Sequence, residues 1–412
     1  MSSDDPRTKY RSLILQSGGD PDLYPMGTQE MIYYPTNKIR LPVNVENVIK
    51  SGLVKEKDRD QIVHYIDIDL PRSGLYKNQL MMLDILANND WERPIYFTGG
   101  SYAEAEYIWM KDYLQLEGLV YKLVPIKTPP NPINPYLMGR VDGDLMYDIV
   151  QQWEWGNANS PEIYHDPETR KNSISYRSNL ARLAEVLIDE EKFEKAEHIL
   201  DLALEKMPIN YFGYYSLLAP FVDGYYRIGK TEKARKVFEA VAKKHQSQLT
   251  YFNSLSLDLR YELGEDILTE VERYRTLVET VLENKDKEKL GSYIQDFRAY
   301  SSYFAFLYGE YDYYTALEEF VEGLYLAQET ENARALADKV AGVYENRLRI
   351  IGGFEPERQR ELNDRIMDEI NGFRRVLLYV NLYDTDEQRD SMENRVYNSI
   401  KNLVVFEDLI ED

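Results

Sequence analysis

The sequence contains no cysteine, only four histidines and no long hydrophobic run, and each absence removes a class of function. Without cysteine the chain has no disulfide, no thiol nucleophile and no cysteine zinc site. Four scattered histidines leave little room for a histidine metal cluster. No run of about 18 uncharged apolar residues occurs, so the sequence predicts no transmembrane helix.

Positive charge is also scarce, because 49 Lys and Arg face 71 Asp and Glu, for a formal net charge of −22. This balance argues against a nucleic-acid surface, which needs clustered basic residues, and against adsorption to an anionic membrane. The length of 412 residues predicts two or three domains with real cores. One residue type is in excess: 35 Tyr stand against 13 Phe and 4 Trp.

The N-terminal part, residues 1–150, predicts a small α/β domain. Short β-branched runs and an amphipathic helix are separated by Pro and Gly turns. The predicted order is a strand, a helix, a second strand, a helical turn and a third strand, at Ile62–Leu70, Leu75–Ala87, Pro94–Thr98, Tyr113–Leu116 and Leu119–Pro125. Strand, helix and strand with short joints predict a βαβ unit with a parallel pair and a right-handed crossover.

Beyond a loop-rich joining region at 151–172, the pattern is helical over 173–412. The joining region carries several prolines, and its tryptophans would be costly to leave in solvent, which argues against a flexible linker. Amphipathic spacing in the later part predicts helices at about 266–283, 287–307, 312–328, 330–349, 357–380 and 386–404.

The helical part begins with a repeat. Lys192-Phe-Glu-Lys-Ala196 recurs as Lys230-Thr-Glu-Lys-Ala234, an offset of 38 residues. The surrounding small and large apolar residues are typical of tetratricopeptide repeats of about 34 residues, predicted here at about 177–210 and 215–248. Small residues such as Ala196 and Ala234 would let paired helices approach closely. An ordinary antiparallel helix bundle is the alternative.

Two candidate sites for chemistry lie in the α/β part. Asp67 and Asp69 are two apart on a strand, so both carboxylates project from one face, and the carboxyl end of a parallel strand is a usual ligand site. Thr98, Gly99 and Gly100 follow the second strand and could hold a phosphate on backbone amides. The alternatives are a capped strand end and a simple turn.

No known catalytic motif accompanies these residues. The sequence has no G-x-G-x-x-G, no Walker lysine, no G-x-S-x-G, no H-E-x-x-H and no EF-hand loop. His165 lies among acids on a loop, where a hydrogen-bonded surface group is the common case. We therefore assign no catalytic residue, no metal ligand and no cofactor.

Tyrosines cluster in the helical part, and Tyr211, Tyr214, Tyr215 and Tyr225 are candidates for a binding groove. Tyrosine offers a flat apolar face and a hydroxyl, which suits the recognition of peptides or sugars. The competing interpretation is that these side chains pack between helices with their hydroxyls reaching solvent. A polypeptide bound there would be extended and either Lys-bearing or neutral.

One stretch carries more than a pattern. Tyr76–Phe97 (YKNQLMMLDILANNDWERPIYF) and Trp109–Pro125 (WMKDYLQLEGLVYKLVP) resemble the C-terminal soluble region of a Bacteroidetes membrane-protein family. The resemblance continues through Met138-Gly-Arg140, Trp153-Glu-Trp-Gly156 and Tyr164–Arg170. This family is glycosyltransferase family 117, which is similar to protein O-mannosyltransferases and has many membrane spans before a soluble tail. The similarity covers roughly residues 30–260.

The resemblance implies that the chain is the extracytoplasmic tail of a larger membrane enzyme, on the periplasmic face of the inner membrane. It also implies that the sugar-transfer site lies in membrane spans outside this chain, which would account for a start, Met1–Pro6, without a signal peptide. Read without the resemblance, the same start describes a cytoplasmic protein.

Two classes of function follow. The first is a non-catalytic binding and scaffolding module that engages an acceptor protein, with or without glycans, or partner subunits through a helical-repeat groove. The second is an independent enzyme or small-ligand site in the α/β part around Asp67, Asp69 and Thr98–Gly100. Saturable peptide binding without turnover would favour the first class, and activity of the isolated chain would favour the second.

Overall fold

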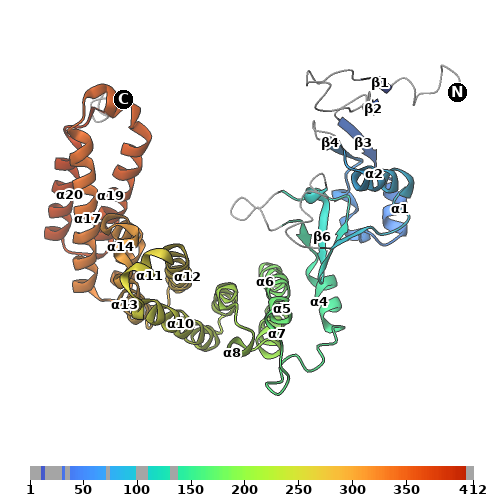
Figure 1. Ribbon diagram of the computed structural model, residues 1–412, viewed down its shortest axis with the longest axis horizontal. Coiled ribbons are helices and arrows are strands. Elements are labelled where there is room, and N and C mark those ends of the chain that lie inside the picture. The colour runs from blue at the N-terminus through green and yellow to red at the C-terminus, as the bar shows by residue number, and fades with distance from the viewer. Residues whose placement is uncertain are drawn as a thin grey trace, which may run out of the picture. The chain divides into compact units, whose positions relative to one another are not determined.

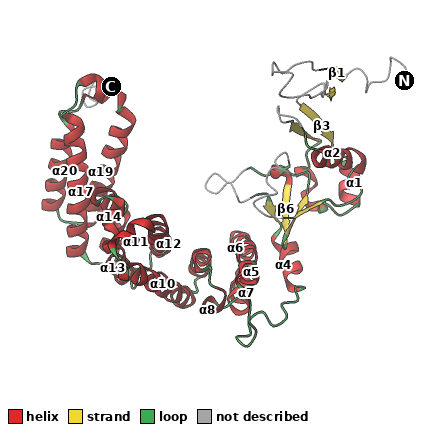
Figure 2. Cartoon of the chain, in the orientation of Figure 1, coloured by secondary structure: helices red, strands yellow, loops and turns green. Residues whose placement is uncertain are grey.

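The chain forms two compact units, Met1–Glu154 and Trp155–Asp412 (Figures 1 and 2). The computed structural model describes residues 11–13, 30–32, 38–70, 75–98, 110–129 and 138–404. Within these residues all strands belong to the first unit, and the second unit is helical (Figure 2). The division between the units lies inside the joining region that the sequence predicts over 151–172.

Over its described residues, the first unit contains three small sheets. Two are antiparallel pairs, β1 (Arg11–Leu13) with β2 (Glu30–Ile32), and β3 (Lys38–Pro42) with β4 (Tyr65–Asp69). The third has the order β5 (Tyr96–Thr98), β7 (Val120–Leu123), β6 (Leu114–Glu117), β8 (Arg140–Val141), and only β6 and β8 run parallel. The helices are α1 (Val45–Lys50), α2 (Lys77–Asn89) and α4 (Gly143–Gln151), with 3-10 turns η1 (Glu56–Gln61) and η2 (Lys111–Tyr113).

The prediction of a βαβ unit is wrong: its two strands and its helix are present, but the strands do not pair with each other. β4 and β5 belong to different sheets, and β5 pairs antiparallel with β7. β4 takes β3 as its partner, in a register that sets Arg40 opposite Asp67 and Lys38 opposite Asp69. Opposite charges facing each other across an antiparallel pair favour that register. The sequence does not predict β3 as a strand, so it gives no indication that β4 pairs with it.

The predicted helical turn at Tyr113–Leu116 is also corrected. The structure has the 3-10 turn η2, which ends at Tyr113, and then the strand β6. Gly118, with a φ of +66°, lies in the short turn that joins β6 to β7. A positive φ costs glycine little, so this position allows the tight reversal that pairs the two strands.

An apolar core joins the pair of β3 and β4 to α1, α2 and β7. β4 alternates as the sequence predicts, with Ile66 and Ile68 buried and Asp67 and Asp69 facing outward. The same core takes in Leu86 from α2 and Trp91, whose indole nitrogen donates a hydrogen bond of 2.9 Å to the carbonyl oxygen of Pro42.

Gly139 is required by the parallel pair of β6 and β8. A Cβ at this position would lie 2.2 Å from the carbonyl oxygen of Leu114, and its φ is +69°. Only glycine combines that backbone conformation with so close an approach. The motif Met138-Gly-Arg140 therefore has a structural reason, because Gly139 brings the chain against β6.

The second unit is a succession of helices. They are α5 (Pro167–Lys171), α6 (Ser173–Asp189), α7 (Phe193–Lys206), α8 (Ile209–Phe212), α9 (Ala219–Arg227), α10 (Thr231–Ser254), α11 (Leu257–Glu262), α12 (Gly264–Glu283), α13 (Leu290–Ser301), α14 (Ala305–Tyr308), α15 (Glu310–Thr315), α16 (Glu318–Leu326), α17 (Thr330–Gly352), α18 (Pro356–Glu361), α19 (Asn363–Tyr383) and α20 (Asp386–Ile400). Two 3-10 turns, η3 (Tyr215–Leu218) and η4 (Ser302–Phe304), lie among them. Each of the six later predicted helices has a counterpart, with shifted ends.

The first pair, α6 and α7, is an antiparallel hairpin. Arg177, near the start of α6, donates a hydrogen bond of 2.8 Å to the carbonyl oxygen of Met207, which directly follows α7. At the other end, only Glu190–Lys192 separate the helices. Ala196 and its counterpart Ala234 in α10 are both fully buried, as the repeat pattern predicts.

A longer internal repeat covers most of this unit. The helices α9, α10, α11 and α12 recur as α16, α17, α18 and α19, and each helix of the second set begins 99 residues after its counterpart. The two copies share Tyr214-Tyr215 with Tyr313-Tyr314, Phe221-Val222 with Phe320-Val321, Gly224 with Gly323, and Thr231-Glu232 with Thr330-Glu331. The chain therefore contains two copies of a four-helix segment.

The shared glycines show why the copies keep them. A Cβ at Gly224 would lie 3.2 Å from Leu200 in α7, and one at Gly323 would lie 2.7 Å from Ile294 in α13. In both copies the glycine lets one hairpin approach the preceding one. The motif Lys-x-Glu-Lys-Ala does not reveal the second copy, because the equivalent segment, Glu329-Thr-Glu-Asn-Ala333, has neither lysine.

Candidate functional site

Asp67 and Asp69 lie on one exposed face of β4, as predicted, and each faces a basic residue of β3. The Arg40 guanidinium contacts both oxygens of Asp67, at 2.7 and 2.9 Å, and this hydrogen bonding holds the pKa of Asp67 below its usual range. Lys38 Nζ lies 3.2 Å from Asp69. Both carboxylates are therefore engaged in cross-strand ion pairs, and the lowered pKa of Asp67 is the opposite of what a general acid needs.

Thr98 ends β5, in a different sheet from the two aspartates, so the sheet pairing does not join the parts of the predicted small-ligand site. Gly99 and Gly100 lie outside the described residues. The sheet that contains β5 carries a buried polar cluster that the sequence did not indicate. Glu117 accepts hydrogen bonds from Gln115 Nε2 at 2.8 Å and from the Tyr96 hydroxyl at 3.1 Å, and pairs with Lys122.

In the helical unit, Tyr215 and Tyr225 donate their hydroxyls to carboxylates. The Tyr225 ring is 1% exposed, and its hydroxyl lies 2.7 Å from Asp201. The Tyr215 hydroxyl lies 3.0 Å from Glu270, which also contacts His245 Nδ1 at 2.9 Å. Burial, with the neighbouring carboxylate, raises the pKa of both phenols. Both side chains therefore have a packing role, but their hydroxyls bond carboxylates, whereas the packing interpretation had them reaching solvent.

Tyr211 of α8 and Tyr214, which follows α8, bond to segments that lie earlier in the chain. The Tyr211 hydroxyl accepts a hydrogen bond of 3.0 Å from the backbone nitrogen of His165 and donates to the carbonyl oxygen of Ile163. Its ring lies 5.4 Å from the His165 ring. Tyr214 has a positive φ of 45°, and its carbonyl oxygen accepts from Arg177. Tyr211 thus fixes part of the joining region.

Arg177 is fully buried and, among the described residues, has no carboxylate partner. Its guanidinium donates to the carbonyl oxygens of Met207 at 2.8 Å, Tyr214 at 3.3 Å and Gly213. Burial lowers the pKa of Arg177 to about 10. A guanidinium is planar and has five N–H donors, so it can bond several carbonyls at once. Arg177 therefore supplies hydrogen-bond donors to the backbone carbonyls at the end of α7 and in the turn after α8.

The hydrogen bond from a tyrosine hydroxyl to a carboxylate is a general device in this chain. Further pairs join Tyr226 to Asp286, Tyr293 to Glu239, Tyr308 to Glu272, Tyr325 to Asp384, Tyr344 to Glu318 and Tyr383 to Glu322. Most of these pairs connect different helices. A hydrogen bond to a charged acceptor is stronger than one between neutral groups. The excess of tyrosine and of acidic residues therefore has a shared structural use.

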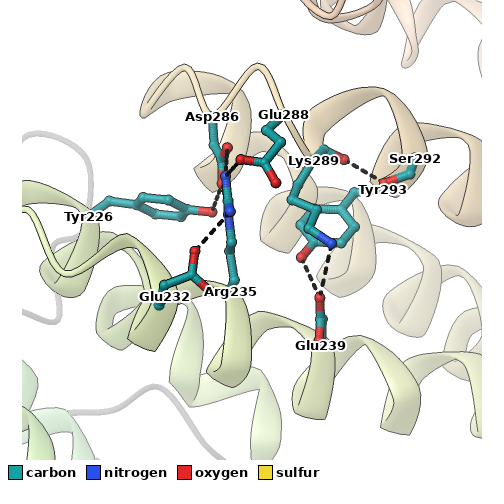
Figure 3. Close-up of polar contacts among 9 residues, drawn as sticks. All are labelled: Tyr226, Glu232, Arg235, Glu239, Asp286, Glu288, Lys289, Ser292 and Tyr293. Atoms are coloured by element: carbon teal, nitrogen blue, oxygen red, sulfur yellow. Dashed lines mark hydrogen bonds and ion pairs between the residues drawn. The ribbon is translucent and has the colours of Figure 1, made fainter.

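Figure 3 shows the most connected of these pairs, which we call the Tyr–Asp–Arg clasp. Arg235 of α10 contacts Asp286 through two nitrogens, each at 2.7 Å, and the Tyr226 hydroxyl of α9 lies 2.8 Å from the same carboxylate. Arg235 also contacts Glu232 and Glu288, both at 2.9 Å. Since Asp286 lies between α12 and α13, the clasp fastens one hairpin to the next.

The second copy repeats this clasp. Arg334 contacts Asp384 at 2.6 Å, the Tyr325 hydroxyl lies 2.7 Å from the same carboxylate, and Arg334 reaches Glu331 at 3.1 Å as Arg235 reaches Glu232. The hydrogen bond from Arg334 outweighs the burial of the carboxyl and lowers the pKa of Asp384 to about 2. The clasp is therefore a conserved element of both copies.

We expect Asp384→Asn to lower the free energy of unfolding by about 2 kcal/mol near neutral pH, because the clasp lowers the carboxyl pKa by about two units. The folded pKa is depressed, so this stabilisation is present above about pH 4 and is lost as the pH falls through about 2. Urea unfolding of wild type and variant at several pH values measures the difference.

The matched control is Asp386→Asn, whose carboxylate is exposed and pairs with Arg389 within one helix. It should change the free energy of unfolding by less than about 0.5 kcal/mol. Equal losses for the two variants, or a difference for Asp384→Asn that does not shrink in acid, would contradict the role of the clasp.

The tyrosine–carboxylate pairs and the two clasps favour a structural role for these polar side chains. Among the described residues, no group of three or more histidine, aspartate or glutamate side chains could hold a metal ion. In the part of the chain that the structure describes, no helix is long and apolar enough to cross a bilayer.

Comparison with known proteins bears on the N-terminal unit. No curated protein matches the chain. No solved structure matches it either. A family model described as TMEM260-associated domain 2 matches residues 1–145 and stops before the helical unit. Residues 1–145 are therefore similar to a domain of TMEM260-like proteins, a protein O-mannosyltransferase-like family.

Proposed function

We propose that this chain is a non-catalytic binding and scaffolding part of a membrane glycosyltransferase-like protein of glycosyltransferase family 117. In this proposal it lies on the periplasmic face of the inner membrane. It engages acceptor protein or partner subunits through its helical-repeat unit. The similarity of residues 1–145 to TMEM260-associated domain 2 supports the membrane-protein context.

The observation that carries the binding role is the 99-residue repeat of helices joined by repeated clasps. Stacked helix pairs form extended surfaces that suit polypeptides. We further propose that the first two hairpins are tetratricopeptide-like. Their second helices, α7 and α10, begin 38 residues apart and bury Ala196 and Ala234 at matching positions, which supports this assignment.

The alternative is an independent enzyme or small-ligand site around Asp67, Asp69 and Thr98–Gly100. The ion pairs of both aspartates with β3 make them poor candidates for acid–base chemistry. We expect Asp67→Asn and Asp69→Asn to leave ligand binding by the chain unchanged.

The test measures binding and turnover on the purified full chain. Synthetic unstructured peptides of graded charge and hydropathy are titrated by fluorescence anisotropy, and transfer from a lipid-linked sugar is assayed in parallel. Saturable binding of one peptide class without turnover is the expected result. Failure of every class to bind would overturn the proposal, and turnover that is lost in Asp67→Asn would favour the alternative.

A further inference from the structure

The first helices of successive hairpins, α9, α12, α16 and α19, contribute to one continuous surface. We call it the first-helix face and define it by Asp223, Glu279, Glu283, Glu319, Glu322, Leu378 and Leu382. Asn284, directly after α12, donates a hydrogen bond of 2.9 Å to Asp223 of α9, and a Cβ at Gly323 of α16 would lie 3.4 Å from Leu282 of α12. The Tyr383 hydroxyl of α19 lies 3.0 Å from Glu322 of α16. These contacts link all four helices.

The α19 part of this face is apolar, and no described residue covers it. Leu378 is 51% exposed and Leu382 is 60% exposed, one helical turn apart, and Tyr383 beside them is 39% exposed. Exposed leucines at adjacent turns of one helix form a stripe that another apolar surface can cover.

The internal repeat shows that this stripe is a local specialisation. Leu378 and Leu382 stand 99 residues after Glu279 and Glu283, at equivalent positions of α19 and α12. The same face is thus acidic along α12 and apolar along α19. Helix packing does not require leucine here, because the first copy has glutamate at both positions.

The α12 and α16 part of the face carries negative charge that its own basic residues do not balance. Among the described residues, neither Glu283 nor Glu319 has an ion pair. Burial raises the pKa of Glu283, and the charges of Asp223 and Glu319 add to this. Burial also raises the pKa of Glu279, although Arg275 pairs with it. A cationic ligand would relieve this repulsion.

We propose that the first-helix face binds an extended cationic and amphipathic polypeptide segment, with its apolar side chains on Leu378 and Leu382 and its Lys or Arg side chains on Glu283 and Glu319. The proposal rests on the binding role proposed above and names its surface and ligand class. Charge excludes the other occupants, since nucleic acid, anionic membrane and a second copy of this chain, at −22, are all negative.

The experiment uses the full chain and three labelled synthetic peptides of one length, read by fluorescence anisotropy. The first alternates Lys and Leu with Gly and Ser, the second replaces Lys with Glu, and the third replaces Leu with Ser. We expect only the first to bind saturably, with an affinity that falls as salt rises.

Two double variants test the face. Leu378→Ser with Leu382→Ser should weaken binding about tenfold, because the bound leucines no longer bury apolar area. Glu283→Gln with Glu319→Gln should weaken binding and flatten its salt dependence. Both should melt at the wild-type temperature, since these side chains are exposed or make no ion pair. Matched controls are Leu257→Ser with Leu259→Ser, exposed leucines of α11, and Glu393→Gln on α20.

The outcomes separate this inference from the broader one. If another peptide class binds and both double variants of the face bind it as wild type does, the first-helix face is not the site, and the binding role stands. If no peptide of any class binds, both proposals fail. Equal binding of the Lys and Glu peptides would overturn the charge argument.

Discussion

Raising the pH above about 10 should unfold the helical unit cooperatively, at a pH where its helices would otherwise remain intact. Burial, with nearby carboxylates, raises the pKa of the tyrosines that fasten its helices: Tyr215, Tyr225, Tyr226, Tyr293, Tyr308, Tyr325 and Tyr344. Ionising any of these phenols beside its carboxylate would place two negative charges in hydrogen-bond contact.

The sign of the effect follows from proton binding in the two states. Above the ordinary tyrosine pKa of about 10, the unfolded chain has released its phenolic protons, whereas the folded chain still holds them. Stability is therefore complete below that pH and falls as the pH rises. Each such tyrosine lowers the free energy of unfolding by up to about 1.4 kcal/mol per pH unit, so the group together reaches several kcal/mol.

The measurement follows phenolate absorbance and helical circular dichroism in the same pH titration. The buried phenols should ionise only as the helices unfold. Lysines also lose their charge in this range, so the matched comparison is Tyr226→Phe with Tyr325→Phe, which removes two of the phenols. That variant should show a shallower fall of stability with pH than wild type. Phenolate formation that is complete before any loss of helix would rule out the explanation.

Replacing Arg177 with methionine should lower the free energy of unfolding by about 3–5 kcal/mol, from loss of donors to buried carbonyls. Methionine keeps the length and apolar stem of the side chain. It leaves the carbonyl oxygens of Met207, Gly213 and Tyr214 without the guanidinium. The competing effect is that wild type carries the cost of a buried charge, which an apolar residue would remove.

Urea unfolding of the full chain decides which effect is larger. Arg177→Lys keeps the charge but has a single donor group, so it should recover only part of the loss. Arg374→Met, at an exposed position of α19, is the matched control and should change stability by less than about 0.5 kcal/mol. Wild-type stability in Arg177→Met would mean that the three carbonyls find other partners.

The sequence predicted local structure well where one period dominates. Alternation placed Ile66 and Ile68 inside and Asp67 and Asp69 outside, and helical spacing located the later helices. It failed on pairing, because pairing depends on residues far apart. β3 is short, ends in proline and carries two basic residues, so it gave no strand signal, and its cross-strand ion pairs with β4 became visible only in the fold.

The candidate sites divide in the same way. The sequence indicated that Tyr211, Tyr214, Tyr215 and Tyr225 are unusual, but composition does not say what a hydroxyl contacts. The partners of Tyr215 and Tyr225 are Glu270 and Asp201, which lie 55 and 24 residues away. Arg177 gave no signal at all, because nothing in a helix sequence marks an arginine that turns inward onto backbone carbonyls.

By itself the sequence determined the class of this protein: an acidic, cysteine-free chain with a mixed N-terminal part and a helical remainder, because composition and hydrophobic period are local properties. Only the tertiary structure decided which strands pair, that Asp286 and Asp384 carry equivalent clasps, and that Leu378 occupies the place of Glu279. These are relations between residues brought together by packing, and packing is set by the whole chain at once.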